Sequence, residues 1–220
     1  MDERLETAAA LFPEVYIVAD IGANHGLLAC YLLETRRAER MWLTDISAKA
    51  LSRARQNIAA RGLQSRTVFA VGDGFAALAE PVEAAAILGM GGQTITCIIK
   101  NAPDGNLPAH LVVSSHTDHD VLRRSLYEAG YRLAEERVAQ SGGRFYIVAS
   151  AVRDTEVQMP DERLLFLGPC LIRLNTPAYR TYLQRRLDAY RPSRTPDGKQ
   201  RYEWLKEEAA RAASNCQNRL

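Results

Sequence analysis

The sequence has 220 residues, of which 47% are hydrophobic and 25% charged, and its formal net charge is +2. This length suffices for one domain of ordinary size with a small appendage. Residues 2–6 are mostly charged and predict no apolar signal segment, and no run approaches the roughly 18 apolar residues of a membrane span. We therefore expect a cytoplasmic protein with no membrane partner.

The four cysteines lie far apart, at Cys30, Cys97, Cys170 and Cys216. No Cys-x-x-Cys pair is present, so the spacing predicts neither a zinc site nor a disulfide framework. We expect reduced thiols in the core and no bound metal.

The first predicted strand spans residues 15–20 and ends in Asp20. A short loop with two glycines follows it, Gly22-Ala23-Asn24-His25-Gly26. This spacing differs from the G-x-G-x-x-G pattern of dinucleotide-binding folds. An acid before the loop places negative charge where a pyrophosphate would lie, whereas it would attract a cationic sulfonium with an amino-acid tail. The loop therefore favours S-adenosylmethionine over a dinucleotide.

Two further predicted strands also lead into acids. Residues 41–45 end in Asp45, and residues 67–71 are followed by Gly72-Asp73-Gly74. The carboxyl ends of parallel strands form one crevice, so we expect these acids to converge there with Asp20. Asp45 would accept hydrogen bonds from both ribose hydroxyls, and Asp73 would meet the adenine amino group.

Each acid also has a structural interpretation: Asp45 could cap the helix that begins near Ser47, and Gly72 to Gly74 could be only a turn. Three acids in register favour the cofactor over these separate explanations. The predicted cofactor-binding residues are Asp20, Gly22, Asn24, His25, Gly26, Asp45, Ile46, Gly72, Asp73, Gly74 and Gly89.

Helical and strand patterns alternate from residue 5 to about residue 126. Strands are predicted at 84–88 and 110–114, and a second clear helix begins near Asp118 or Asp120. The helix that begins at Ser47 carries an apolar stripe of Leu51, Ala54 and Ile58. This alternation predicts an α/β fold with a doubly wound, mostly parallel sheet.

After Gly130 two strand-like stretches, beginning at Tyr131 and Arg144, are joined by Gly142-Gly143 and predict an antiparallel hairpin. A parallel sheet that finishes in such a hairpin is typical of class I methyltransferases. The prediction is therefore a seven-stranded Rossmann-like methyltransferase sheet.

Beyond residue 154 the pattern becomes helical. Asn175-Thr176-Pro177 begins a helix with the stripe Tyr179, Tyr182, Leu183, Leu187 and Tyr190. After a break at 191–198 a second stripe follows: Tyr202, Leu205, Ala209 and Ala212. We expect an S-adenosylmethionine-binding methyltransferase domain over residues 1–154 and a helical hairpin over residues 155–220 that packs on it.

Six segments have a combined resemblance to one family: Ala19-Asp-Ile-Gly-Ala-Asn-His25-Gly-Leu-Leu28, Gly72-Asp-Gly-Phe75, Leu88-Gly-Met-Gly-Gly92, Leu122-Arg123, Gly130-Tyr131 and Gly168-Pro169. Together they resemble the bacterial tRNA (adenine-22-N1)-methyltransferase family, which belongs to the class I S-adenosylmethionine-dependent methyltransferases. The similarity covers nearly the whole chain. It implies an enzyme that methylates N1 of an adenine, with tRNA as its partner.

The chain departs from the family pattern at two places, which predicts a divergent member. Ser114-Ser115-His116 replaces Q-P-N, and Ala23-Asn24-His25-Gly26-Leu27 replaces S-D-H-A-Y. Two alternatives therefore stay open. One is a methyltransferase for a small molecule, in which the tail forms a lid. The other is a non-catalytic RNA- or protein-binding module on a methyltransferase scaffold.

The predicted catalytic residues are His25, Met90, Gly91 and His116. Adenine N1 is a neutral nucleophile that needs positioning and desolvation more than a strong base. Backbone groups of Gly89-Met90-Gly91-Gly92 could face the base, because glycines allow a close approach, but a tight strand-to-helix turn would use the same glycines. His116 could contact the base or cap a helix, and His25 could contact the cofactor, the base or its own loop.

A tRNA substrate requires a basic surface beside the cleft, because N1 must be exposed before it can react. The candidates are Arg36, Arg37, Arg40, Arg180, Arg185 and Arg186. The excess of basic residues lies after residue 150, which indicates either a polyanion partner or a solvated helical face. We expect a monomer or a weak dimer.

Overall fold

The computed structural model describes residues 2–191 and 195–217. Its centre is a seven-stranded sheet with the order β3-β2-β1-β4-β5-β7-β6. The strands are β1 Val15–Ile21, β2 Ala38–Asp45, β3 Thr67–Val71, β4 Ala84–Met90, β5 His110–Ser115, β6 Tyr131–Ser141 and β7 Arg144–Arg153. Strands β1 to β5 pair in parallel, and β7 is antiparallel to both β5 and β6. The predicted sheet and its terminal hairpin are confirmed.

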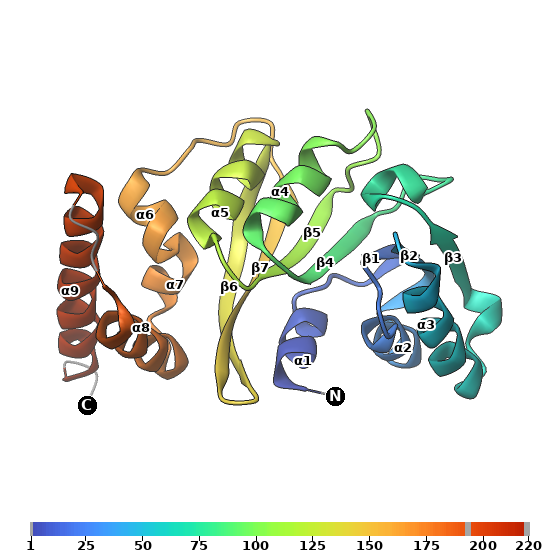
Figure 1. The fold of residues 1–220 in the computed structure, drawn as a ribbon, viewed down its shortest axis with the longest axis horizontal. Helices are drawn as coiled ribbons and strands as arrows, with labels where there is room; N and C mark the ends of the chain where they lie inside the picture. Colours follow the sequence, from blue (N-terminus) through green and yellow to red (C-terminus); the bar gives the residue numbers. More distant parts are fainter. Residues whose placement is uncertain (1, 192–194, 218–220) are drawn as a thin grey trace.

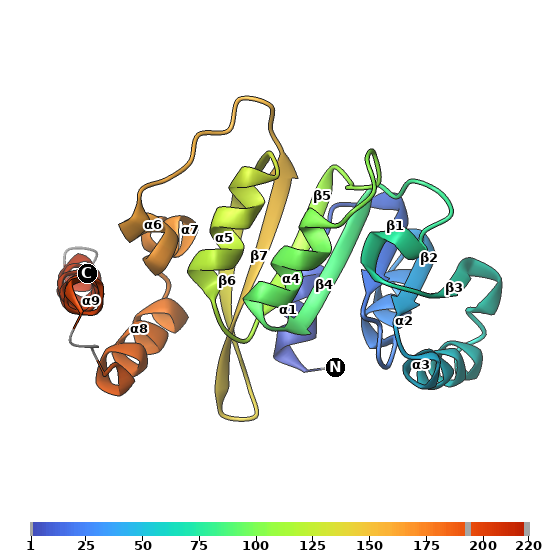
Figure 2. The same cartoon turned by 45° about the horizontal axis from the view of Figure 1, so that its top comes forward.

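Helices cover both faces of this sheet (Figures 1 and 2). One face packs against α1 Glu3–Ala10, α2 Leu27–Glu34 and α3 Ala48–Ala60, and the other against α4 Gly92–Lys100 and α5 His119–Glu128. Successive strand residues point to opposite faces, so Leu43 joins the first core cluster and Trp42 the second. Both faces are apolar, as a parallel sheet between two helical layers requires.

Helix α3 begins where the sequence predicts. The Ser47 side chain accepts a hydrogen bond from the backbone N–H of Ala50 (3.3 Å) and so caps the helix. The predicted stripe of Leu51, Ala54 and Ile58 is buried. This helix follows β2 directly, so its first turn lies at the carboxyl edge of the sheet.

The β6–β7 turn also follows the prediction. Gly142 and Gly143 have φ values of 55° and 75°. Two successive residues in the left-handed region form the tight turn that matches the twist of a hairpin, and glycine adopts it without strain.

The described part of the tail contains four helices, α6 Glu162–Leu167, α7 Pro169–Leu174, α8 Pro177–Ala189 and α9 Pro196–Gln217. Helix α8 has the predicted cap at Thr176, and the buried residues of both predicted stripes lie in a third core cluster. In Figures 1 and 2 α9 lies across α8, so the two pack as a crossed pair. The sequence did not predict α6 and α7, because six residues are too few for a helical repeat to be recognised.

The cysteines agree only in part with the prediction. Cys30 and Cys170 are buried, whereas Cys97 is exposed, so the expectation of a core thiol is wrong there. The side chain of Cys216 lies outside the described residues. Among the helices that the structure describes, none combines the length and hydropathy needed to cross a membrane.

Candidate functional site

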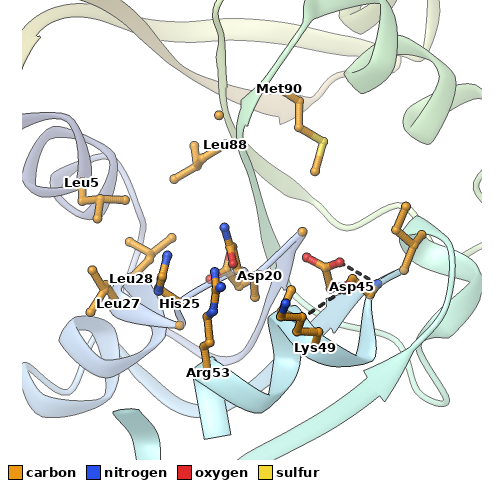
Figure 3. A pocket seen from close by; sticks show the side chains of 18 of the residues that line it. Leu5, Asp20, His25, Leu27, Leu28, Asp45, Lys49, Arg53, Leu88 and Met90 are labelled. Carbon is orange, nitrogen blue, oxygen red and sulfur yellow. Dashed lines mark hydrogen bonds between the residues drawn. The ribbon is translucent and has the colours of Figure 1, made fainter. Parts of the chain in front are cut away.

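The carboxyl ends of β1, β2 and β4 surround a cavity of about 690 Å³ (Figure 3). Asp20 and Asp45 line its floor, and Met90 extends over it from the opposite side. The predicted residues that line it are Asp20, Gly22, Asn24, His25, Gly26, Asp45, Ile46, Gly89 and Met90. The fold therefore brings the glycine loop and two of the three acids to one site.

A second cavity of about 320 Å³ contains the third acid, Asp73, with its neighbours Gly72 and Gly74. The two cavities share the residues Gly22, Asp45, Ile46 and Met90. An elongated ligand whose middle lies at Asp45 would therefore occupy both.

One wall of this second cavity was not predicted from the sequence. Four residues of α4 and its end line it: Thr94, Cys97, Ile98 and Asn101. They recur at intervals of three and four residues, which is the spacing of one helical face. Extending the periodicity search beyond the glycine loop would have found them.

The glycine loop is shaped by close packing. Gly22 has a φ of 78°, and a side chain there would overlap the methyl group of Met90. Gly26 has a φ of 62°, and a Cβ atom there would lie 2.9 Å from the Leu43 side chain. The backbone N–H groups of Gly22 and Ala23 both donate to the Thr44 carbonyl, which ties the loop to β2. These constraints hold the loop open toward the cavity.

Asp20 has an unusual environment. Its side chain is buried, and desolvation, followed by the charge of Asp45, raises the pKa of Asp20 from 3.8 to about 7. An acid with this pKa is only partly ionised near neutral pH when no ligand is bound. A cation placed beside it would stabilise the carboxylate and lower its pKa.

Asp45 and Ile46 remain available to a ligand. Asp45 Oδ1 accepts the backbone N–H of Ser47 (2.8 Å), while Ser47 itself caps α3, so Asp45 is not the capping residue. Within the described part of the chain, Asp45 Oδ2 has no hydrogen-bond partner. Ile46 is 77% exposed, although both cavities adjoin it. An exposed apolar side chain beside a carboxylate with one available oxygen suits an aromatic ring attached to a diol.

The Gly89–Gly92 segment serves both structure and site. Gly91 is the N-cap of α4, and a Cβ atom at Gly92 would lie 2.7 Å from the Thr117 carbonyl, so these two glycines form a strand-to-helix turn. Gly91 lines neither cavity. Gly89 instead lies at the cavity wall.

Of the three residues that replace Q-P-N, only His116 faces outward. Ser114 and Ser115 are buried in β5, whereas His116 is exposed. Its backbone N–H donates to the Met90 carbonyl (2.9 Å), which places it beside the β4 end. His116 lines neither cavity itself, but a Cβ atom at Gly89 would lie 3.8 Å from its Nε2 atom.

His25 and His119 differ in environment. His25 is exposed at the rim of the larger cavity, and its carbonyl accepts the Asn57 amide (2.9 Å). His119 shares a hydrogen bond with Ser115 (2.9 Å), and burial lowers the pKa of His119 to about 3. The described residues contain no group of His, Cys, Asp or Glu arranged to hold a metal ion.

Cations other than the predicted ones border the cavity. Arg4, Lys49 and Arg53 line it. By contrast, Arg37 donates to the Phe12 carbonyl (3.0 Å) and Arg40 pairs with Glu80 (3.1 Å). The predicted tail residues Arg180, Arg185 and Arg186 also donate to backbone carbonyls. Much of the predicted basic surface is therefore used within the protein.

Comparison with known proteins places this chain among methyltransferases. A family model described as "Methyltransferase domain" matches residues 1–149. The tRNA (adenine(22)-N(1))-methyltransferase of Bacillus subtilis is 28% identical over 153 residues, which is 69% of this chain and 64% of that protein. The chain thus spans slightly less than two thirds of this relative.

Two solved structures are also similar. The structure of the B. subtilis m1A22 tRNA methyltransferase TrmK has a TM-score of 0.77 and 22% identity, covering 97% of both chains. That of M. capricolum TrmK in complex with S-adenosyl-homocysteine has a TM-score of 0.75 and 20% identity, covering 96% of this chain and 98% of that one. These similarities establish the shared fold, tail included.

Proposed function

Because this chain belongs to the methyltransferase domain family, we propose that it is an S-adenosylmethionine-dependent enzyme that methylates N1 of an adenine in tRNA. The meeting of the two cavities at Asp45 carries this proposal. The joined cavities suit a ligand with a ribose in the middle, at Asp45. Its adenine would lie at the Asp73 end and its cationic amino-acid tail at the Asp20 end. The tRNA substrate is supported by the relatives' activities.

The residues present fit this cofactor. The carboxylate of Asp45 would hold the ribose hydroxyls, Asp73 would accept from the adenine amino group, and Ile46 would cover one face of the ring. Asp20 would neutralise the cationic end of the ligand. When bound, S-adenosylmethionine supplies an electrophilic methyl group.

Gly89 is placed to receive the target base. The pairing of β4 with β5 shifts between Leu88 and Met90, and neither ladder of β4 includes Gly89. We propose that its backbone carbonyl accepts a hydrogen bond from the adenine amino group. Because methylation leaves a positive charge on the ring, a carbonyl dipole aimed at it would stabilise the product-like transition state.

The acidity of Asp20 predicts a pH dependence of cofactor binding. Below about pH 7 the Asp20 carboxyl is mostly protonated, so binding a cation beside it must release a proton. We expect the affinity for S-adenosylmethionine, measured by calorimetry between about pH 6 and pH 8, to fall below pH 7 by up to about tenfold per pH unit. The Asp20→Asn variant should lose this dependence.

The Asp20→Asn variant also tests, through the stability of the folded protein, whether folding raises the pKa of Asp20. The native pKa of Asp20 exceeds its unfolded value, so ionisation in the native state destabilises the free protein increasingly as pH rises from about 4 to 7. Asp20→Asn should therefore raise the melting temperature of the ligand-free protein at pH 8 and change it little at pH 4. An unchanged melting temperature at pH 8 would show that Asp20 is not strained by burial.

Two cationic side chains on α3, Lys49 and Arg53, are expected to contribute to tRNA binding. Lys49 and Arg53 lie one turn apart on α3 and point into the mouth of the cavity in Figure 3. We expect Lys49→Gln with Arg53→Gln to raise KM for tRNA about tenfold and to weaken its salt dependence, because phosphate contacts are lost. Lys100→Gln, which removes an exposed lysine at the far end of α4, should have little effect. Equal losses for both variants would contradict a specific role for Lys49 and Arg53.

We propose that residues 1–154 form the catalytic domain and that residues 155–220 help to dock the RNA. The net positive charge of the tail favours this division. Function on tRNA implies a cytoplasmic location, and we propose a monomer or a weak dimer.

Calorimetric titration with S-adenosylmethionine, followed by transfer of a radiolabelled methyl group to unmodified bulk tRNA, tests the proposal. Binding with labelling supports it. Binding without labelling would favour a small-molecule substrate or a non-catalytic module, and absence of binding would refute the assignment of Asp20, Asp45 and Asp73.

A further inference from the structure

Three side chains gather over Gly89 at the rim of the larger cavity. The Arg4 guanidinium lies over the Tyr146 ring, with its Cζ atom 5.3 Å from the ring centroid. The His116 and Tyr146 rings meet edge to face, with centroids 5.8 Å apart. A Cβ atom at Gly89 would lie 3.1 Å from Arg4 Nη1. Residues from α1, β4, β7 and the segment after β5 therefore converge where the target base would arrive.

Arg4 has donors to spare. Its Nε atom is buried and has no hydrogen-bond partner among the residues that the structure describes. Oδ2 of Asp2 lies 4.0 Å from Nη2, at the limit of an ion pair. The Tyr146 ring restricts the guanidinium, and cation–π contact is favourable without satisfying its N–H donors. Such a group is held ready for an anion with two or more acceptor oxygens.

We infer that Arg4, held by Tyr146, binds a phosphate of the target nucleotide, while the exposed ring of His116 stacks on its base. This inference rests on the proposed function. A base placed against Gly89 has its own backbone phosphates within one nucleotide, and a guanidinium fork matches phosphate geometry. The T-shaped contact with Tyr146 fixes one edge of the His116 ring and leaves a face for the base, as in other recognition of unstacked nucleotides.

Steady-state kinetics on unmodified tRNA, with cofactor affinity measured separately by calorimetry, test this role. We expect Arg4→Gln to raise KM for tRNA about tenfold or more, with the dissociation constant for S-adenosylmethionine changed less than about twofold. Arg4→Lys should recover part of the loss, because it keeps a charge that a phosphate can use. In Arg4→Gln, the dependence of KM on salt concentration should also become weaker, by the amount expected for the loss of about one phosphate contact.

Two Tyr146 variants test whether the ring of Tyr146 acts by holding Arg4 or only by stabilising the fold. Tyr146→Leu should reproduce the KM defect, whereas Tyr146→Phe keeps the ring and should resemble the native protein. Two controls lie away from the site: Tyr16→Leu removes an aromatic ring that is 62% exposed at the opposite end of β1, and Arg61→Gln removes a cation at the far end of α3. Melting temperatures identify any variant that fails to fold, and Arg4→Lys then carries the test.

Three results would overturn the inference. The first is an unchanged KM for tRNA in a folded Arg4→Gln variant. The second is an Arg4→Gln variant that loses as much affinity for S-adenosylmethionine as for tRNA, which would assign Arg4 to the carboxylate of the cofactor. The third is a Tyr146→Leu variant with native kinetics. Failure of the proposed function looks different, because the native protein would then bind S-adenosylmethionine and label no tRNA at all.

Discussion

Asp45→Ala is expected to weaken S-adenosylmethionine binding at least about 100-fold and to abolish methyl transfer, while the protein stays folded. The reason is position: Asp45 is the only one of the predicted acids that both cavities share. Two charge-assisted hydrogen bonds to a ribose contribute about 3 kcal/mol or more, and this corresponds to about two orders of magnitude in affinity. Calorimetric titration of the variant measures the loss directly.

Ser47→Ala is the matched control for Asp45→Ala. It removes the cap of α3, which costs about 1 kcal/mol of stability, but leaves the carboxylate of Asp45 in place. We expect near-native cofactor affinity in this control and tRNA binding that survives in Asp45→Ala. If Asp45→Ala binds the cofactor normally, the ribose assignment is wrong. If Asp45→Ala functions like the native protein and neither of them binds the cofactor, the chain is a non-catalytic RNA- or protein-binding module.

Arg123→Met is expected to destabilise the protein by about 3–5 kcal/mol. Arg123 pairs with Glu136 at 2.7 Å, and both side chains are almost fully buried. Arg123 also donates to the Leu165 carbonyl, and Glu136 accepts the backbone N–H of Cys170. This ion pair therefore joins α5 and β6 to the first two helices of the tail. Removing the arginine alone leaves an uncompensated carboxylate in the core.

Urea denaturation of Arg123→Met and of the double variant Arg123→Met with Glu136→Met measures this effect. The double variant should be more stable than the single one, because it removes both buried charges together. Arg124→Met, which breaks an exposed pair with Glu162, should change stability by no more than about 1 kcal/mol. A single variant as stable as that control would show that the ion pair does not hold the tail on the sheet.

The ends of the strands could be located well from the sequence, and with them the cavity that we propose for the cofactor. Asp20, Asp45 and Asp73 could be found because a buried parallel strand is a continuous apolar run, and the first polar residue after it marks the edge of the sheet. The helix cap at Ser47 and the glycine turn of the hairpin follow from local chemistry that tertiary packing did not override.

Features that depend on long-range packing were not predictable in the same way. Arg4 precedes the first strand by eleven positions and reaches the cavity only because α1 packs beside β6 and β7. The arginines Arg37 and Arg40 look like free surface cations in the sequence, yet the fold provides acceptors for both. Likewise, the burial of Ser114 and Ser115 depends on the neighbouring strands and could not be read from the motif.

Nucleoside analysis is the measurement that decides whether this protein methylates adenine N1 in tRNA. Unmodified tRNA would be incubated with the protein and labelled S-adenosylmethionine, digested to nucleosides and separated by chromatography. We expect the label to co-elute with 1-methyladenosine. Label in another nucleoside, or none from a protein that binds the cofactor, would contradict it.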